Sequence, residues 1–318
     1  MTVGSVECQQ AIVGQWTGSA ERQATAVTAA ATVSWSDVVG TGIGPPGGSC
    51  SIGAVHVAPA LPVPSFLSAA DGVRLAYREV GEGRPTVLLH GFSSTAVINW
   101  IAPGHAAAVA ATGRRVILPD LRGHGDSDRS HDPAAYPADV VTDDVFALLD
   151  HLGLTDGEFD LGGYSLGGRT SLRAVVRGAR PGRLVVAGMG LAGVTHMRGH
   201  SFADVFLHVL TDPPPADGTF APGSAEGRIT DFVARIGADR TALRLTLGTA
   251  VDTPAADVAR VDVPTLVVCG DRDDPADARV LSDVLPRSTF ATVKGDHISA
   301  ANRSDALGAA MAAFLGAG

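Results

Sequence analysis

A serine set among glycines is the first feature of the sequence that suggests chemistry. Residues 162–168 read GGYSLGG and follow the apolar stretch EFDL. Ser165 therefore lies in a G-x-S-x-G pattern, with a strand pattern before it and a helix pattern after it, which is the context that a nucleophile turn requires. Glycine two positions to either side avoids collisions in so tight a turn. We predict that Ser165 is a nucleophile.

Neither a flexible linker nor a phosphate-binding loop fits the surroundings of this glycine-rich run. A flexible linker is not expected between strongly apolar, periodic segments. A phosphate-binding loop needs a lysine after its glycines, and none follows here. The alternative that remains beside a nucleophile is a glycine-rich turn that serves packing.

A serine hydroxyl is a poor nucleophile without a base, and the base needs an acid that orients it. His297, in VKGDHISA, follows the last predicted strand and is the only histidine after residue 208. Asp271, Asp273 and Asp274, in CGDRDDP, follow the preceding predicted strand. Because ligands of open α/β sheets bind at the carboxyl ends of the strands, we expect one of these aspartates to meet His297 and Ser165 there. The spacing alone leaves the choice among the three open.

The elements that must position these side chains are recognisable from residue 66 onward. FLSAADGVRLAYREVG predicts a hairpin around Asp71-Gly72. Short apolar runs follow, of the length typical of strands buried on both faces of a parallel sheet: PTVLLHG, RRVILPD, EFDLGGYS, RLVVAGMG, PTLVVCG and STFATVKG. Helical patterns separate them. The sequence therefore predicts an α/β fold with a mostly parallel eight-stranded sheet and helices on both faces.

The composition and the pattern divide the chain into three parts. Residues 1–62 carry only four charged side chains and end in the proline-rich APALPVP, so we expect an N-terminal extension with little independent structure. Residues 63–190 and 264–318 hold the strand–helix alternation and would form the core. Residues 191–263 interrupt it with helical patterns such as HSFADVFLHVL. We predict that this segment is an inserted helical cap; an ordinary long crossover is the alternative.

Four motifs, in order, resemble those of the α/β-hydrolase superfamily: LLHGF after one strand, DLRGHGDSD after the next, GYSLGG at the turn, and GDRDDP followed by GDH. From residue 66 to about residue 315 the chain looks most like the cap-bearing bacterial branch of esterases, C–C bond hydrolases and cofactor-free haloperoxidases. The resemblance implies that Ser165 is the nucleophile and His297 the general base. The family's G-x-x-D pattern, read from Gly270, selects Asp273 as the acid.

The resemblance also implies roles for residues near the serine. The backbone N–H groups of Phe92 and Leu166 would form the oxyanion hole, whose donors typically contribute about 2.7–4 kcal/mol each to transition-state stabilisation. His90 and His124 lie in family motifs and would brace loops around the site. Tyr164 is expected to pack under the turn.

The implied activity is that of a serine hydrolase, which cleaves a small carboxylic ester through an acyl-enzyme intermediate, with the cap supplying an apolar acyl pocket. C–C bond hydrolysis of a ring-cleavage dienol ketone, lactone opening and perhydrolysis use the same triad and stay open. Epoxide hydrolases and dehalogenases of this fold carry an aspartate where Ser165 stands. A rival of another class is a small-molecule receptor that keeps the triad. The resemblance implies no cofactor and no metal.

Composition excludes several other classes of function. The chain has 318 residues, a net charge of −9 and no long basic block, so nucleic acid is not an expected partner. No apolar run approaches the roughly 18 residues that a membrane span needs. Gly42, Gly44 and Gly47 match G-x-G-x-x-G, but Pro45 and Pro46 lie inside the match and the residues after it are not helical, so no dinucleotide cofactor is expected.

Three cysteines, Cys8, Cys50 and Cys269, make no disulfide framework in a chain of this length. The opening MTVGSVECQQ has no basic residue and is unlike a secretory leader. Both observations favour the cytoplasm. The sequence does not indicate an oligomeric state.

Overall fold

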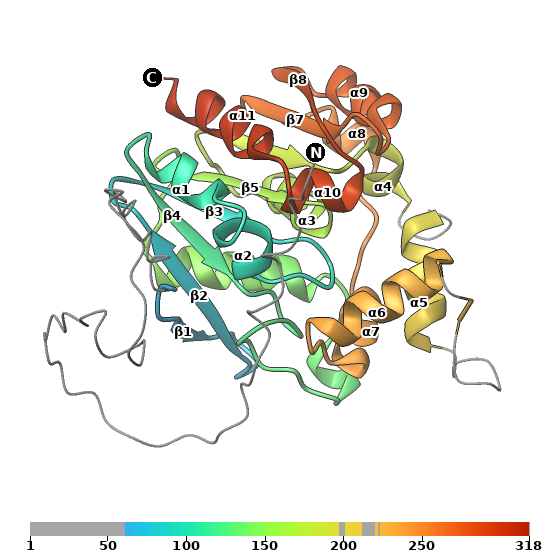
Figure 1. Cartoon of the computed structure of the whole chain (residues 1–318). Coiled ribbons are helices and arrows are strands. Elements are labelled where there is room, and N and C mark those ends of the chain that lie inside the picture. The colour runs from blue at the N-terminus through green and yellow to red at the C-terminus, as the bar shows by residue number, and fades with distance from the viewer. Residues whose placement is uncertain (1–60, 197–200, 212–219, 222, 318) are drawn as a thin grey trace, which may run out of the picture. The chain divides into compact units, whose positions relative to one another are not determined.

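The computed structural model describes residues 61–196, 201–211, 220–221 and 223–317 (Figure 1). All of them belong to one compact unit, Pro59–Gly318. The predictions made for Cys8 and Cys50, for the glycines at 42–47 and for nearly all of the N-terminal extension lie outside the described residues.

An eight-stranded sheet runs through the described unit in the order β1-β2-β4-β3-β5-β6-β7-β8. β1 pairs with β2, and β2 with β4, in antiparallel fashion, and all the other neighbours are parallel. The predicted hairpin and the mostly parallel sheet are thereby confirmed. The strands are β1 Ser65–Ser68, β2 Arg74–Val80, β3 Arg84–Leu89, β4 Arg114–Pro119, β5 Asp160–Tyr164, β6 Leu184–Ala187, β7 Thr265–Gly270 and β8 Ser288–Val293.

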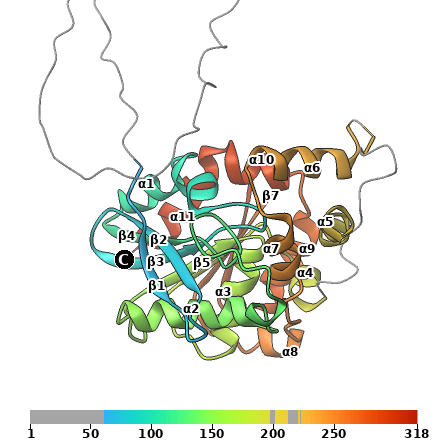
Figure 2. The same cartoon turned by 90° about the horizontal axis from the view of Figure 1, so that it is seen from below.

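Helices cover both faces of this sheet, as the α/β pattern predicts. Figure 2 shows α1 and α11 on one side of the strands and α2, α3 and α8 on the other. The helices outside the segment between β6 and β7 are η2 Val97–Ile101, α1 His105–Ala110, η3 Pro133–Ala135, α2 Val140–His151, α3 Leu166–Val176, α9 Pro275–Val284, α10 His297–Asn302 and α11 Asp305–Gly316. η2 is a π-helix and η3 a 3₁₀-helix.

Two hydrophobic cores result from the alternation of side chains along the central strands. On β6, Val185 packs in the same cluster as Met311 of α11, whereas Val186 packs in the same cluster as Leu172 of α3. All five residues of β5 and all six of β7 are buried. Strands that are apolar on both faces need cover on both faces, which is why the short runs are continuous rather than alternating. Because β5, β7 and β8 run parallel, their carboxyl ends lie along the same side of the sheet.

The segment between β6 and β7 contains α4 Leu191–Thr195, α5 Ser201–Thr211, α6 Ala225–Arg235, α7 Arg240–Leu247 and α8 Ala255–Val258. We call residues 191–263 the helical insert. Its own small core consists of Phe206, Leu210, Val233 and Leu243, and Phe92 of the sheet domain packs against it. Figure 1 shows α5, α6 and α7 grouped beside one end of the sheet.

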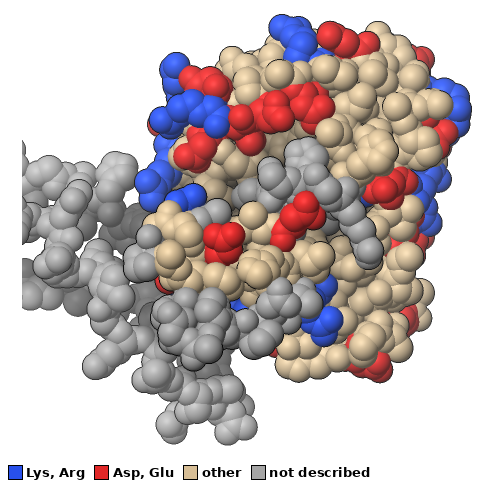
Figure 3. All heavy atoms as spheres, turned by 90° about the vertical axis from the view of Figure 1, so that its right-hand side faces the viewer, with Lys and Arg blue, Asp and Glu red and all other residues tan. Residues whose placement is uncertain are grey.

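The face that carries the insert has mixed charge. Figure 3 shows mostly uncharged side chains over its described surface, with acidic and basic ones side by side in several places. No helix within the described ranges is long and apolar enough to cross a membrane.

Candidate active site

The turn around Ser165 joins β5 to α3 and has an unusual backbone. Ser165 has φ 52° and ψ −115°, a positive φ that few side chains adopt, and its N–H donates to the carbonyl oxygen of Ala187 at 2.7 Å. A Cβ on Gly167 would lie 2.1 Å from the carbonyl oxygen of Leu89, and one on Gly163 would lie 2.3 Å from the carbonyl carbon of Gly167. The two glycines are therefore required by steric contact.

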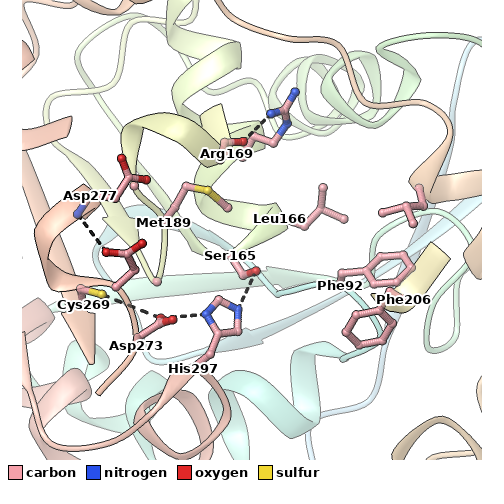
Figure 4. A pocket seen from close by; sticks show the side chains of 15 residues that line it. Phe92, Ser165, Leu166, Arg169, Met189, Phe206, Cys269, Asp273, Asp277 and His297 are labelled. Carbon is pink, nitrogen blue, oxygen red and sulfur yellow. Dashed lines mark hydrogen bonds and ion pairs between the residues drawn. The ribbon is translucent and has the colours of Figure 1, made fainter. Parts of the chain in front are cut away.

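The structure brings Ser165, His297 and Asp273 into one hydrogen-bonded chain (Figure 4). His297 Nε2 lies 3.0 Å from Ser165 Oγ, and His297 Nδ1 lies 2.8 Å from Asp273 Oδ2. These partners assign the tautomer: Nδ1–H donates to the carboxylate, and Nε2 accepts from the serine hydroxyl. Ser165 is buried, with 7% of its surface exposed.

The two neighbouring aspartates have other partners. Asp271 pairs with Lys294 at 2.7 Å and accepts from the N–H of Gly295 at 3.0 Å, which lowers the pKa of its carboxyl group. Asp274 stands at the N-cap of α9, where its side chain accepts from the N–H of Asp277 at 3.1 Å. Of the three candidates, only Asp273 reaches the histidine.

Two sets of hydrogen bonds hold the backbone at His297, one at Asp296 before it and one at its own carbonyl oxygen. Asp296, before it, forms a capping box with Ser299 at the start of α10, and the hydrogen bonds from Ser299 lower the pKa of that carboxyl group. Tyr164 donates its hydroxyl proton to the carbonyl oxygen of His297 at 2.7 Å. Tyr164 is buried below the turn, as the sequence predicts, but the sequence offered no signal for its bond to the histidine.

The loop before η2 lies against the turn. The N–H of Gly91 donates to Asn99 Oδ1 at 2.8 Å, and a Cβ on Gly91 would lie 3.4 Å from the carbonyl oxygen of Tyr164. Within the described part of the chain, the N–H groups of Phe92 and Leu166 have no acceptor. Two backbone N–H groups near Ser165 are thus available as hydrogen-bond donors. Asn99, which holds this loop, is a residue that sequence reasoning missed.

His90 and His124 brace the same loop. His90 Nδ1 lies 2.8 Å from the carbonyl oxygen of Gly91, and His90 Nε2 accepts from the N–H of Leu121 at 2.9 Å. His124 Nε2 accepts from the N–H of Ser93 at 3.2 Å, and the two rings lie 5.1 Å apart. Burial lowers the pKa of His90 to about 4 and that of His124 to about 3. Both rings are therefore neutral near pH 7, which suits a bracing role.

Comparison with known proteins agrees with this architecture. A family model described as the alpha/beta hydrolase fold matches residues 85–234. The chain has the α/β-hydrolase fold. The site lies where this fold places its ligands, at the carboxyl ends of the parallel strands.

Three relatives illustrate the range of reactions in the superfamily. The chain is 28% identical over 258 residues to a non-heme chloroperoxidase of Kitasatospora aureofaciens, a match that covers 71% of this chain and 88% of that protein. It is 36% identical over 126 residues to a 2-hydroxymuconate semialdehyde hydrolase of a Pseudomonas strain, covering 40% of this chain and only 43% of the relative. A solved hydrolase of Pseudomonas aeruginosa superposes with a TM-score of 0.63 at 25% identity, covering 80% of this chain and 98% of the other.

A cavity adjoins Ser165 on the side of the helical insert. Its volume is about 130 Å³. Its apolar lining comes from Phe92, Leu166, Met189, Phe206 and Leu247. We call it the acyl cavity. Figure 4 shows the rings of Phe92 and Phe206 at one end and the acidic side chains at the other.

The acidic end of the acyl cavity carries two carboxylates besides that of Asp273. Asp277 accepts from the N–H of Ala192 with both oxygens, at 3.0 and 3.1 Å, and Asp274 lies beside it at the start of α9. Neither forms an ion pair with a described residue. The cation that lines the cavity is Arg169, whose guanidinium donates to the carbonyl oxygens of residues 193, 194 and 251 and points away from Ser165 (Figure 4).

Cys269 is the third residue that the sequence did not connect with the site. It is a buried strand residue, as predicted, but its Sγ lies 3.8 Å from Asp273 Oδ2. Burial, together with the charge of Asp273, raises the pKa of the thiol to about 12. The group is therefore a thiol near pH 7 and faces the Asp273 carboxylate as a weak donor. In the described ranges, no three His, Cys, Asp or Glu side chains are arranged to hold a metal ion.

Proposed function

We propose that this hydrolase cleaves small carboxylic esters through an acyl-enzyme intermediate, with Ser165, His297 and Asp273 as its catalytic triad. The observation that carries the proposal is the pair of hydrogen bonds to the two ring nitrogens of His297, 3.0 Å to Ser165 Oγ and 2.8 Å to Asp273 Oδ2. The strained turn supports it, because such backbone strain persists where the surrounding structure holds a reacting group in place.

The chemistry follows from this arrangement. Ser165 Oγ attacks the ester carbonyl carbon while His297 Nε2 takes the hydroxyl proton, and Asp273 stabilises the imidazolium that forms. The N–H groups of Phe92 and Leu166 stabilise the oxyanion. As the bond to the alcohol oxygen breaks, His297 returns the proton to the leaving alcohol, and the acyl group stays on Ser165. Water then attacks the acyl-enzyme by the same route in reverse and releases the acid.

The size of the acyl cavity supports a small acyl group. At about 130 Å³ it is close to the roughly 150 Å³ of an engineered apolar cavity that binds benzene. An acyl chain of about six non-hydrogen atoms fills such a space. We further propose that the helical insert, residues 191–263, acts as a cap on a core formed by residues 63–190 and 264–318, because α5 and α7 supply Phe206 and Leu247 to the cavity.

The charge of the cavity supports an uncharged acyl group. A carboxylate on the substrate would approach Asp274 and Asp277, whose charges repel it, and the donors of Arg169 are already directed to backbone carbonyls. This argues against a ring-cleavage product that carries a carboxylate as the substrate for C–C bond hydrolysis. Lactone opening and perhydrolysis of small acids use the same triad and are alternatives within the proposal. We further propose that the protein acts in the cytoplasm.

Hydrolysis of p-nitrophenyl acetate and butyrate by the wild type and by Ser165→Ala tests the proposal. We expect multiple turnovers by the wild type and a loss of about 10⁴-fold or more in the variant. A matched Ser130→Ala variant, changed in the loop before η3, should keep the wild-type rate. Saturable binding without turnover would instead support a receptor. Faster cleavage of a dienol ketone than of any ester in a series of graded acyl length would support a C–C bond hydrolase.

A further inference from the structure

A second, smaller cavity adjoins Ser165 and His297 on the side of α10 and of residues 91–94, which carry the proposed oxyanion donor Phe92 and which we call the oxyanion loop. Its volume is about 30 Å³. Side chains of the loop and the helix line it with polar groups: Ser93, Ser94, Asn99 and Asn302. We call this cavity the polar niche. It shares Ser165 and His297 with the acyl cavity but none of the carboxylates at that cavity's acidic end.

The polar niche concentrates buried groups that lack hydrogen bonds. Among the described residues, eight buried side-chain N or O atoms have no partner, and four of them line the niche: Ser93 Oγ, Ser94 Oγ, Asn99 Nδ2 and Asn302 Oδ1. Ser93, Ser94 and Asn99 are 1%, 8% and 2% exposed. An unsatisfied buried polar group costs about 1–3 kcal/mol, so four around one small space require an explanation.

The donors and acceptors match a very small polar ligand. Asn99 Nδ2 can only donate, Asn302 Oδ1 can only accept, and the two hydroxyls can do either. A cavity needs roughly 10–15 Å³ to hold one water molecule, so a volume of about 30 Å³ takes about two at most. A carboxylate or a sugar does not fit this space, whereas a water molecule, which both donates and accepts, satisfies the set.

We propose that the polar niche binds the water molecule that hydrolyses the acyl-enzyme. The inference rests on the proposed function and adds to it a binding site for the second substrate, water. Held between Asn99, Asn302 and the serine hydroxyls, the water lies beside Ser165, which carries the acyl group, and His297, whose Nε2 is the base. His297 takes one proton from the water as its oxygen bonds to the acyl carbon. The bond from that carbon to Ser165 Oγ then breaks, and Oγ takes the proton from His297.

A larger groove next to the polar niche provides a route by which water can enter. An open groove of about 710 Å³, between α6 and α10, shares Phe206, Phe232, His297 and Ile298 with the niche. The leaving alcohol departs through this groove, and water enters the niche by the same opening. Hydrolysis therefore does not require that the acyl cavity be opened, so the acyl group stays in place while water arrives on the other side of Ser165.

Two variants that remove niche groups test the inference. Asn302→Leu replaces an acceptor by an apolar side chain of similar size, and Ser94→Val fills the space. Arg303→Leu, one position further at the end of α10 and outside the niche, is the matched control. Stopped-flow release of p-nitrophenol and intact-protein mass spectrometry during turnover of p-nitrophenyl acetate give kcat/KM, kcat and the acetylated fraction of the enzyme. We expect kcat/KM, which reports acylation, to stay within about twofold, and deacylation to slow about tenfold.

The acetylated fraction at saturating substrate should therefore rise in Asn302→Leu and Ser94→Val but not in Arg303→Leu. An equal fall of kcat and kcat/KM with no rise of the acetylated fraction, at an unchanged melting temperature, would overturn the inference. Failure of the proposed function has a different signature, since the wild type itself would then not be acetylated. In that event the inference falls together with the proposed function. Where the wild type is acetylated, a crystal structure at high resolution adds an independent test: ordered water between Asn99 and Asn302 supports the inference, and a dry or collapsed niche contradicts it.

Discussion

The turn around Ser165 and the helical insert are built on different principles. At the turn, backbone atoms press on one another, so that Gly163 and Gly167 have no room for a methyl group, and the loop opposite is fixed by buried histidines. In the insert, the helices pack around a core of four buried side chains. The insert residues that line the acyl cavity are Phe206 and Leu247. Under the proposed function, the first region sets which reaction is possible, and the second sets which acyl group fits.

The largest effect that follows from this difference concerns the triad acid. Asp273→Asn replaces the acceptor for His297 Nδ1–H by an amide that favours the wrong tautomer, and we expect kcat/KM for p-nitrophenyl acetate to fall about 10⁴-fold. Asp271→Asn, two residues earlier, loses only the pairing with Lys294 and should change kcat/KM less than about threefold. Equal losses in both variants would show that the loop, rather than one carboxylate, supports the histidine.

The next largest effect distinguishes the two regions by stability. Gly167→Ala would place a Cβ 2.1 Å from a backbone oxygen of β3, and we expect the free energy of unfolding to fall by about 4 kcal/mol or more. Gly248, which ends α7 of the insert, has φ −68° and its nearest Cβ contact would lie at 3.3 Å, so Gly248→Ala should change that free energy by about 1 kcal/mol at most. Urea unfolding of both variants measures this. Similar urea midpoints for the two variants would mean that the backbone of the turn accommodates a methyl group more easily than its contacts indicate.

The same contrast between backbone packing and side-chain packing explains which features of the structure the sequence predicts. The continuous apolar runs give the strands, and the glycines at 163 and 167 give the turn, because these patterns reflect backbone packing that few sequences satisfy. The G-x-x-D register selects Asp273, the aspartate that lies beside His297. Asp296, next to His297, caps α10, a role that is not predicted from the sequence.

Other features of the site have no local sequence signal. Cys269 lies in a predicted buried strand and Asn99 in no recognised pattern, and only the tertiary structure brings Cys269 to Asp273 and Asn99 to the oxyanion loop. The acidic end of the acyl cavity is likewise invisible in the sequence. Asp277 lies in the first turn of α9 and meets the first turn of α4, which is 85 residues away along the chain.

The buried histidines predict how stability depends on pH. The folded-state pKa values of His90 and His124, about 4 and about 3, lie below the ordinary value of 6.5. Below pH 6.5 the unfolded chain therefore binds protons that the folded chain cannot bind. The free energy of unfolding should be highest above pH 6.5 and should fall by about 2.7 kcal/mol per pH unit between pH 6 and pH 4.5 for the two groups together.

His124→Gln, which removes one of these groups, should reduce that slope by about half. His151→Gln, at an exposed position at the end of α2, is the control and should leave it unchanged. Urea unfolding at pH 7.5, 6 and 5 gives the slopes. A slope in His124→Gln that equals the wild-type slope would mean that the loop beside Ser165 takes up protons without loss of folding, and hence that it is less rigid than its contacts suggest.

The smallest effect concerns the insert's control of acyl length. Leu247→Ala removes three carbon atoms from the wall of the acyl cavity, and we expect the ratio of kcat/KM for the hexanoate ester to that for the acetate ester to rise about tenfold. Leu245→Ala, on the same helix and also half-buried but outside the cavity, should leave the ratio within about twofold. Because both side chains lie half-buried on α7 and only Leu247 lines the cavity, a difference between the variants that appears in the ratio but not in stability isolates the contact with the acyl group. If both shift the ratio equally, the insert controls acyl length through its position over the sheet rather than through the side chains that line the cavity.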